Sequence, residues 1–504
     1  MSISGEINRI RSEVNTQTDL ISQIRSALNG KVAGGGESAE PILQDKTLTA
    51  NGTYTADSGY DGFGTVTVNV PTPTVKLQEK TATANGEVVP DGGYDGLSKV
   101  TVNVPSSGGG GSGDSTVEPE EKEVNFYDYD GTRLYSYTLT EINSLTSLPP
   151  LPTQQGLTCQ GWNYTLEELK TLNRETDVGA TYITQDGKTR IYVSLPEGYT
   201  SPIVGLCPNG TVTVDWGDGT TSTLTGTSAT TAKYTSAHAY AQPGDYVITL
   251  STNGTYGLGG HSSLTIGPYI LRYATNGNGA NYTYRTFINK IELGANITTL
   301  GTHTFRHCAN LKSITIPNGI TAIGDSTFAY CVNLKGVVIP KGVTTVGSAA
   351  LRSVSSAKMV SFPLGITSVG EYVLAETDTM TRVTFPGGIT LIPRYSITGS
   401  VNLRNVIIPN SVTSIASYAL TNGYNIRGMV YPKGLVSVEA AAFSNSYAII
   451  LHDFSACEQV PTLANTSAFT GITSQCKIFV PAALYNEWVA ATNWSTYASY
   501  IVAV

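Results

Sequence analysis

The sequence predicts a mainly β protein that is divided into several domains. Glycine accounts for 53 of the 504 residues and only 13% of the residues are charged, a composition typical of short strands joined by tight turns. A chain of this length exceeds what a single hydrophobic core supports. Prolines at positions 317, 340, 363, 386, 409 and 432 follow one another at intervals of 23 residues, which indicates a solenoid.

Residues 1–30 carry a heptad pattern, with apolar side chains at alternating steps of four and three. Isoleucine at both seam positions favours three helices over two, so we predict a trimeric coiled-coil stem with one polar layer. The alternative is a single amphipathic helix packed against its own domain. The predicted trimerisation residues are Ile3, Ile7, Ile10, Val14, Gln17, Ile21, Ile24 and Leu28.

Two short stretches after the stem repeat one another in register. Residues 45–71 and 79–105 share Lys-Thr-x-Thr-Ala-Asn-Gly near their start and Val-Thr-Val-Asn-Val-Pro at their end. The dipeptides Asn51-Gly52 and Asn85-Gly86 favour hairpin turns, and the alternating valines indicate half-buried strands. Each unit is too small to fold alone, so three copies gathered by a trimeric stem would stabilise one another.

The same units contain Tyr-Asp-Gly, beginning at Tyr60 and Tyr94. They resemble spacers in tail and surface proteins of phages that infect gut bacteria, and the short helix before them resembles the N-termini of those proteins. The resemblance implies a protein of a bacteriophage particle. Residues 31–44 are a predicted linker, and residues 106–123 are a Gly/Ser and acidic linker.

Residues 124–175 are predicted to form a small β module. Two β-rich segments flank the turn at Asp130-Gly131, and a later segment ends in Gly161-Trp162. The stretch is similar to the internalin B-type repeat, which implies a β-grasp-like spacer. Asp128 and Asp130 could suggest a cation site, but exposed turn formers explain both residues better.

Residues 176–252 contain Val-Thr-Val-Asp-Trp-Gly-Asp-Gly-Thr at 212–220 and His-Ala-Tyr-Ala-Gln-Pro-Gly-Asp-Tyr at 238–246. Together these motifs resemble a PKD domain, which implies an immunoglobulin-like β-sandwich that acts as a spacer or adhesion module. Asp215, Asp218 and His238 could be interpreted as a metal or catalytic cluster. The turn and core geometry of the motif accounts for all three residues better.

Residues 288–480 form the repeat array. Each unit supplies a short strand, a turn and a second inward segment, so that stacked units form a continuous sheet. Every unit from 288 to 443 fills the same six slots with apolar residues, and the first unit has Ile288, Ile291, Leu293, Ile297, Leu300 and Phe305.

Segments 305–311 and 328–334 share Phe-x-x-Cys-x-x-Leu. The array closely resembles the BspA-like class of leucine-rich repeats, which implies attachment to a host or cell surface. Cys308 and Cys331 occupy equivalent slots, and a ladder of buried thiols is a better interpretation than a metal site.

Residues 481–504 resemble the terminal helix that closes such arrays. An exposed last repeat would aggregate without a cap. Trp488 and Trp494 are therefore interpreted as capping residues rather than as sugar-stacking residues.

Two surfaces are candidates for receptor contacts. One is the outward face of the repeat sheet, whose small neutral side chains suit a glycan or a protein: Ser313, Thr315, Met359, Arg382, Thr384 and Asn405. The other is the Tyr/Gly-rich connection at residues 253–287, since Tyr with Gly and Asn is also the composition of adaptable paratopes. Its alternative is a β connection that caps the array. The tyrosines concerned are Tyr256, Tyr269, Tyr273, Tyr282 and Tyr284.

Several function classes find no support in the sequence. Catalytic motifs such as GxSxG, HExxH and a phosphate loop are missing, so we expect no enzyme, no cofactor and no metal site. The net charge of −8 comes without a basic stripe, which argues against a nucleic-acid partner. Neither a signal peptide nor an apolar stretch long enough to span a bilayer is visible, so we expect no membrane insertion.

The leading hypothesis is therefore a bacteriophage tail fibre or baseplate protein. It would be made in the host cytoplasm and assembled into the virion as a homotrimer. Its N-terminal end would bind other virion proteins, and its C-terminal repeats would bind a bacterial surface glycan or protein. Alternatives are a bacterial cell-surface adhesin, a phage head fibre or decoration protein, and a polysaccharide depolymerase carried on a fibre.

Overall fold

The computed structural model describes residues 123–172, 174–258, 270–273 and 283–504, together with four strands nearer the N-terminus. The chain divides into two units, residues 1–117 and 118–504, which are described separately. The predicted stem and its trimerisation residues lie outside the described residues, so the coiled coil stays a prediction.

The first unit contains two small two-stranded sheets. The pairs are β1 (Leu43–Leu48) with β2 (Gly62–Val68), and β3 (Leu77–Ala82) with β4 (Gly96–Val102). Strands β1 and β3 begin at equivalent positions of the sequence repeat. Both pairs are parallel. The Asn-Gly dipeptides lie outside the described residues, so the hairpin turns stay a prediction.

The second unit begins with an α/β module at residues 123–184. Its four-stranded sheet has the order β6-β5-β8-β7, with β5 and β8 parallel in the centre and antiparallel strands outside. Phe126, Trp162 and Val178 lie in its core. The elements are β5 (Glu123–Tyr127), β6 (Arg133–Thr138), α2 (Leu139–Ser144), β7 (Leu157–Trp162), α3 (Leu166–Leu172) and β8 (Thr176–Thr184). The sequence analysis placed β8 in the following module, whereas the strand completes this sheet.

The next segment is a β-rich cap built around one long strand. The N-terminal half of β10 pairs with β12, β14 and β15, and its C-terminal half pairs with β11 and β13. Trp216, which follows this strand, is fully buried. The elements are β9 (Thr189–Leu195), β10 (Pro202–Asp215), β11 (Thr221–Thr227), β12 (Lys233–Tyr234), β13 (Gly244–Thr252), β14 (Thr255–Leu258), β15 (Leu271–Tyr273) and α4 (Thr283–Thr286).

Two strand pairs join this cap to the repeat array. β9 pairs antiparallel with β16, and β14 pairs parallel with β17. One hydrophobic cluster runs from Ile191 through the array to Ile501. The cap therefore closes the N-terminal end of the solenoid rather than forming a separate core.

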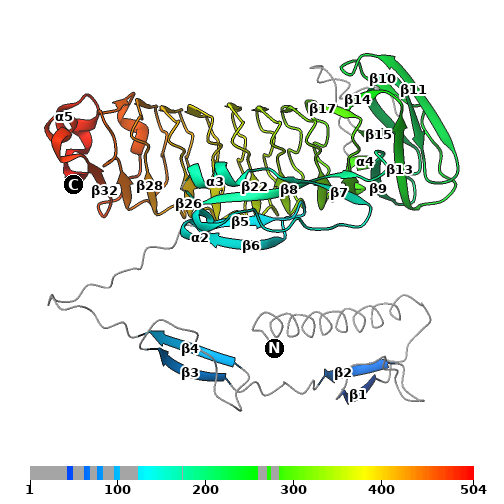
Figure 1. Cartoon of the computed structure of the whole chain (residues 1–504), viewed down its shortest axis with the longest axis horizontal. Helices are drawn as coiled ribbons and strands as arrows, with labels where there is room; N and C mark the ends of the chain where they lie inside the picture. Colours follow the sequence, from blue (N-terminus) through cyan, green and yellow to red (C-terminus); the bar gives the residue numbers. More distant parts are fainter. Residues whose placement is uncertain are drawn as a thin grey trace. The chain divides into compact units, whose positions relative to one another are not determined.

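The solenoid has two walls of short parallel strands (Figure 1). We call the first wall series A: β16 (Ile288–Glu292), β18 (Ser313–Thr315), β20 (Gly336–Val338), β22 (Met359–Ser361), β24 (Arg382–Thr384), β26 (Asn405–Ile407), β28 (Gly428–Val430), β30 (Leu451–Asp453) and β32 (Lys477–Val480). We call the second wall series B: β17 (Ile297–Leu300), β19 (Ala322–Ile323), β21 (Thr345–Val346), β23 (Ser368–Val369), β25 (Leu391–Ile392), β27 (Ser414–Ile415), β29 (Ser437–Val438) and β31 (Thr462–Leu463).

The register of both walls follows the sequence period. Arg382 pairs with Asn405 in series A, and Leu391 pairs with Ser414 in series B, so each partner lies one period further along the chain. The apolar slots predicted from 288 to 443 are buried, except for half-buried Val369. The predicted solenoid is confirmed, because the apolar repeat leaves each unit only one face to bury against its neighbours.

The C-terminal end is closed by short helices and a last strand. Trp488 and Trp494 are fully buried, and both rings pack against Phe454 of the last repeats. Their predicted capping role is confirmed. The elements are η1 (Thr466–Phe469), η2 (Ala482–Leu484), α5 (Tyr485–Ala490), η3 (Trp494–Tyr500) and β33 (Ile501–Ala503), of which β33 pairs with β32.

A buried histidine in β30 makes the stability of the solenoid sensitive to acid. Burial lowers the pKa of His452 to about 3, and its Nδ1 shares a hydrogen bond of 2.7 Å with the Tyr431 hydroxyl. Because the folded pKa lies below the ordinary 6.5, the unfolded chain binds the proton more tightly, and stability falls as pH drops below 6.5. The loss is at most about 1.4 kcal/mol per pH unit, or about 2 kcal/mol at pH 5.

We therefore expect His452→Asn to flatten the dependence of the unfolding free energy on pH between 7 and 5, measured by urea denaturation. The variant should be less stable than the parent at pH 7, because a buried ring is lost. His238→Asn, outside the solenoid, serves as the control. Equal pH slopes in the parent chain and the His452 variant would show that another group causes the acid sensitivity.

Candidate binding groove

The α/β module lies along the outward face of series A (Figure 1). This close approach depends on small side chains on both sides. A Cβ atom on Gly179 of β8 would lie 2.4 Å from both methyl groups of Val338, so only glycine allows this contact. The outward positions Ser313, Thr315 and Ser361 are also small, and the module buries them.

Polar contacts fix the position of the module on the array. The Asn163 amide nitrogen donates to the Ile339 carbonyl at 2.9 Å and to the Ser361 hydroxyl at 2.8 Å. Its amide oxygen accepts from the backbone N–H of Gly179 at 2.8 Å. The Tyr164 hydroxyl donates to the Phe362 carbonyl. Sequence reasoning missed both side chains, although they follow the Gly161-Trp162 motif directly.

Arg382 forms the charged part of this contact. Its guanidinium binds the Asp177 carboxylate and lies 3.3 Å from Glu175, and all three side chains are at most 19% exposed. Burial raises the pKa of Asp177 although Arg382 acts in the opposite direction. Burial also opposes the charge of Arg382, but the two carboxylates outweigh it and raise its pKa. We treat the cluster as ionised at neutral pH because one guanidinium serves both carboxylates.

The predicted receptor face of the sheet is therefore largely occupied by the chain itself. Ser313, Thr315 and Met359 are between 0% and 8% exposed beneath the module. Arg382 and Asn405 are half-buried and bind the module, and Thr384 is half-buried beside them. This corrects the interpretation of these six residues: they belong to an intramolecular interface, in which Arg382 supplies a charge.

The tyrosines of the Tyr/Gly-rich connection also need correction. Tyr256 and Tyr284 are each 1% exposed. The Tyr256 hydroxyl bonds to Thr189 at 2.7 Å, and the Tyr284 hydroxyl accepts from the backbone N–H of Ser201 at 3.1 Å. Both residues belong to the core of the cap. Tyr269, Tyr282 and the side chain of Tyr273 lie outside the described residues.

The polar cluster of the PKD-like motif forms a structural network. The His238 ring bonds to Asp218 at 2.7 Å and stacks on Trp216 at 4.5 Å between centroids. Asp215 accepts from the backbone of Gly217 at 2.9 Å. These contacts agree with the turn and core interpretation of the motif.

The other polar and thiol candidates are also engaged locally. Asp130 accepts from the backbone of Thr132, as expected for a turn residue. Asp128, expected to be exposed, is instead 3% exposed and accepts from the Gln154 side chain. Cys308 and Cys331 are fully buried neighbours in the core, as the sequence predicted. Among the residues that the structure describes, no three His, Cys, Asp or Glu side chains are grouped so that they could hold a metal ion.

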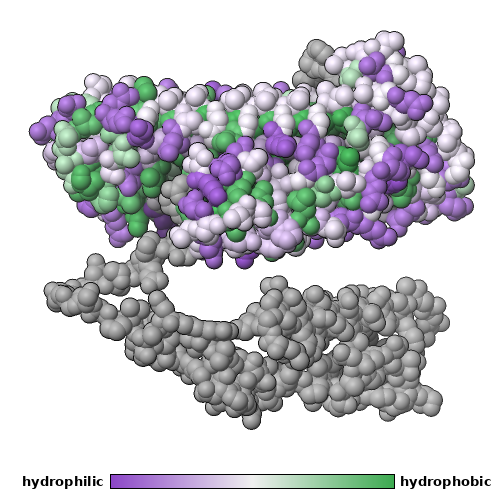
Figure 2. Space-filling view, viewed as in Figure 1, coloured by the Kyte–Doolittle hydropathy of each residue, from purple (hydrophilic) through white to green (hydrophobic). Residues whose placement is uncertain are grey.

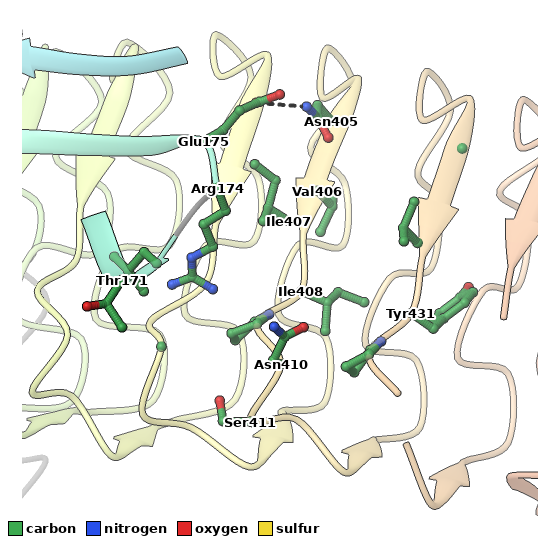
Figure 3. Close-up of a pocket in the computed structure, with 16 residues that line it drawn as sticks. Thr171, Arg174, Glu175, Asn405, Val406, Ile407, Ile408, Asn410, Ser411 and Tyr431 are labelled. Atoms are coloured by element: carbon green, nitrogen blue, oxygen red, sulfur yellow. Dashed lines mark hydrogen bonds between the residues drawn. The ribbon is translucent and has the colours of Figure 1, made fainter. Parts of the chain in front are cut away.

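An open groove of ≈ 480 Å³ begins where the module leaves series A (Figure 3). The segment after α3 forms one side, and β26, β28 and the turns after them form the other. Ile407 and Val430 supply apolar surface, and Val430 is 64% exposed. Asn410 and Ser411 supply an amide and a hydroxyl group. On the outer surface of this unit, polar and apolar residues are interspersed (Figure 2).

Arg174 and Glu175 are the charged side chains among the described residues that line this groove. Figure 3 shows Arg174 extending toward Asn410, whereas Glu175 turns to Asn405, to which it bonds at 3.1 Å. The described residues place no carboxylate within 4.0 Å of the Arg174 guanidinium, whose one bond to protein runs to the Phe385 carbonyl at 3.4 Å. Burial lowers the pKa of Arg174. The groove therefore holds a partly desolvated cation without a counter-ion.

Two further atoms at the groove lack partners. The Nε of Arg174 and the hydroxyl of Ser411 are buried and make no hydrogen bond to the described residues. Gly387 leaves the space that the guanidinium needs, because a Cβ there would lie 3.2 Å from its Nη2. The geometry suits binding of an anion, since Arg presents parallel N–H donors to a carboxylate.

Helices long and apolar enough to cross a bilayer do not occur in the part of the chain that the structure describes.

Comparison with known families identifies the repeats. Residues 279–404 and 390–486 match the BspA type leucine-rich repeat region, in six copies. The C-terminal solenoid is thus an array of BspA-type leucine-rich repeats, as the sequence predicted. A comparison with curated proteins finds no match.

Solved structures of leucine-rich repeat proteins are similar to part of the chain. A leucine-rich cell surface protein from Faecalibacterium prausnitzii is 19% identical over 38% of this chain and 60% of its own, with a TM-score of 0.32. A leucine-rich repeat protein from Bacteroides ovatus is 18% identical over 38% and 56%, with a TM-score of 0.29. One from T. pallidum is 21% identical over 31% and 72%, also at 0.29. The chain thus spans 60% and 56% of the first two proteins.

Proposed function

We propose that this chain is a non-enzymatic adhesive appendage of a bacteriophage particle, a trimeric tail fibre or baseplate protein. Its N-terminal end would attach to other virion proteins, and its BspA-type repeats would bind a glycan or protein on the bacterial surface. The observation that carries the proposal is the order of the modules along the chain. A heptad seam and tandem spacers precede a solenoid that is closed at both ends and carries an open groove.

We also propose that the modules between stem and array are spacers of the internalin B and PKD types. Support for the first is the β6-β5-β8-β7 sheet with its parallel central pair, which is a β-grasp-like arrangement. Support for the second is the long strand β10 followed by the buried Trp216 of the PKD-like motif. In this chain both modules also contact the array.

The proposal can be tested on particles. Antibodies raised against residues 288–504 should label the tail or baseplate of phage particles in electron micrographs, and purified particles should contain the chain by mass spectrometry. Labelling on the head would support the head-fibre alternative instead. Recovery of the chain from a bacterial envelope fraction, with none in particles, would contradict the phage assignment.

A bacterial surface adhesin is the second candidate, because the repeats are of the BspA type and one similar structure is named a cell surface protein. The same fractionation distinguishes the two functions. A depolymerase would release reducing ends from the host polysaccharide. We expect the purified chain to bind host cells and to release none.

A further inference from the structure

We propose that the groove beside the α/β module binds the carboxylate of an acidic sugar, with Arg174 as its anchor. This inference rests on the proposed adhesive function, and it specifies the chemistry of the receptor. The ligand would be a uronic-acid unit within a surface polysaccharide.

The position of Arg174 favours an external carboxylate. The two nearby acidic side chains, Glu175 and Asp177, already bind Arg382. Among the described residues the guanidinium of Arg174 bonds only to the Phe385 carbonyl, while its buried Nε is removed from water and has no partner. An unpaired cation in such a place is unfavourable, and a bidentate carboxylate would compensate for its lost hydration.

The remaining lining suits a sugar. The exposed Asn410 offers an amide that can bond to ring hydroxyls, and neither Asn410 nor Ser411 bears a charge. Ile407 and Val430 offer apolar surface to the C–H face of a pyranose. Apolar surface combined with a few placed polar groups is typical of small-ligand sites.

The charge of the solenoid favours an anionic partner. Residues 288–504 contain 13 Lys and Arg and 9 Asp and Glu, a balance of 13 − 9 = +4, although the whole chain carries −8. In five repeats the residue just before the series A strand is an exposed cation. These five side chains make no ion pair with described residues. They are Lys312, Lys335, Lys358, Arg404 and Arg427. Such a row attracts a polyanion over a distance of about 8–10 Å in salt solution.

The test uses the full chain and an oligogalacturonate tetramer, with binding measured by calorimetry. The matched neutral probe is the same tetramer with methyl-esterified carboxylates, and inorganic phosphate is a competitor. We expect the tetramer to bind, with the ester and phosphate at least tenfold weaker. Binding of the ester at equal strength, equal competition by phosphate, or no binding of the tetramer would overturn the inference.

Three variants place the binding in the groove. Arg174→Gln should weaken binding of the tetramer at least tenfold. Gly428→Leu should block the groove without disturbing the fold, because a Cβ there meets only the Leu451 carbonyl at 4.0 Å. Arg394→Gln removes a cation outside the groove and should leave binding unchanged. Unchanged binding in the first two variants would contradict the site.

The test of the acidic-sugar site and the test of the proposed function can give different results. If the parent chain binds host cells but not the tetramer, the adhesive function stands and the ligand class is wrong. If the tetramer binds and particles lack the chain, the groove is an acidic-sugar site on a protein that is not part of a phage.

Discussion

Replacing Arg382 with methionine is expected to lower the unfolding free energy of the unit formed by the α/β module and the solenoid by about 3–5 kcal/mol. Removal of the guanidinium leaves Asp177, which is 8% exposed, as a buried carboxylate without a cation. Methionine fills much of the volume of the arginine stem, so the loss reflects charge rather than a cavity. Urea denaturation at pH 7 measures the difference.

The pH dependence of the unfolding free energy of Arg382→Met provides a second measurement. Burial already raises the pKa of Asp177, and loss of the opposing cation should raise it further. A carboxyl whose folded pKa exceeds its unfolded pKa binds its proton more tightly in the folded state, so stability increases as pH falls through the folded pKa. The deficit of Arg382→Met relative to the parent chain should therefore shrink between pH 7 and pH 5.

Arg352→Met is the matched control. Arg352 pairs with Glu376 at 2.6 Å on the surface of the array, and the side chains are 32% and 41% exposed. Pairs of this kind contribute less than about 1 kcal/mol.

Adding Asp177→Asn to Arg382→Met should restore part of the stability. If both arginine variants lose the same amount, or if the Arg382 deficit is independent of pH, the buried cluster is not what holds the module.

The solenoid could be predicted from the sequence because its repeat pattern is visible within each short stretch of the chain. A strict period with six apolar slots specifies which side chains point inward, and the slots from Ile288 to Phe443 are buried as predicted, with Val369 half-buried. The Trp488 and Trp494 cap could be predicted for the same reason, since a last repeat must cover its open end.

The docking of the α/β module could not be predicted, because its partners are far apart in the sequence. Gly179 contacts Val338 and Asp177 binds Arg382, and neither pair is related by a periodicity. Small neutral side chains on an exposed sheet face and on a covered one look alike in the sequence. The predicted receptor face of the sheet is therefore wrong. For Tyr256 and Tyr284 the alternative of a β connection that caps the array fits, since their hydroxyls bond within the core.

Arg174 shows why the groove could not be predicted from the sequence. In the sequence it stands beside Glu175 and near Asp177, where it would be interpreted as one member of a neutralised surface cluster. In the described residues both carboxylates bind Arg382, which approaches from the array, and Arg174 has no carboxylate partner. An anion site of this kind arises from competition between two arginines, and only the tertiary structure decides which one is paired.

An open groove is expected to bind a single sugar weakly, so the proposed adhesive function would depend on the number of copies that act together. A trimer that engages three sites at once can exceed the affinity of one site by about 10²–10⁴-fold. Deletion of residues 1–40 is therefore expected to weaken binding to host cells by about 100-fold or more. It should also lower the mass in light scattering from that of three chains, each of 53.2 kDa in the parent, to that of one shortened chain.

The seam residues distinguish loss of the trimer from loss of some other N-terminal contact. Ile10→Asp and Ile24→Asp place charges in the predicted seam and should reproduce both effects, whereas Ile10→Val keeps a β-branched seam residue and should behave like the parent chain. Gln17→Ile removes the polar layer and should make the trimer more resistant to heat. A single-chain mass for the parent would contradict the stem, and a trimer that persists after the deletion would place the oligomer contact in the rest of the chain. Avidity would then depend on residues after 40, and the heptad pattern would describe a helix that packs within one chain.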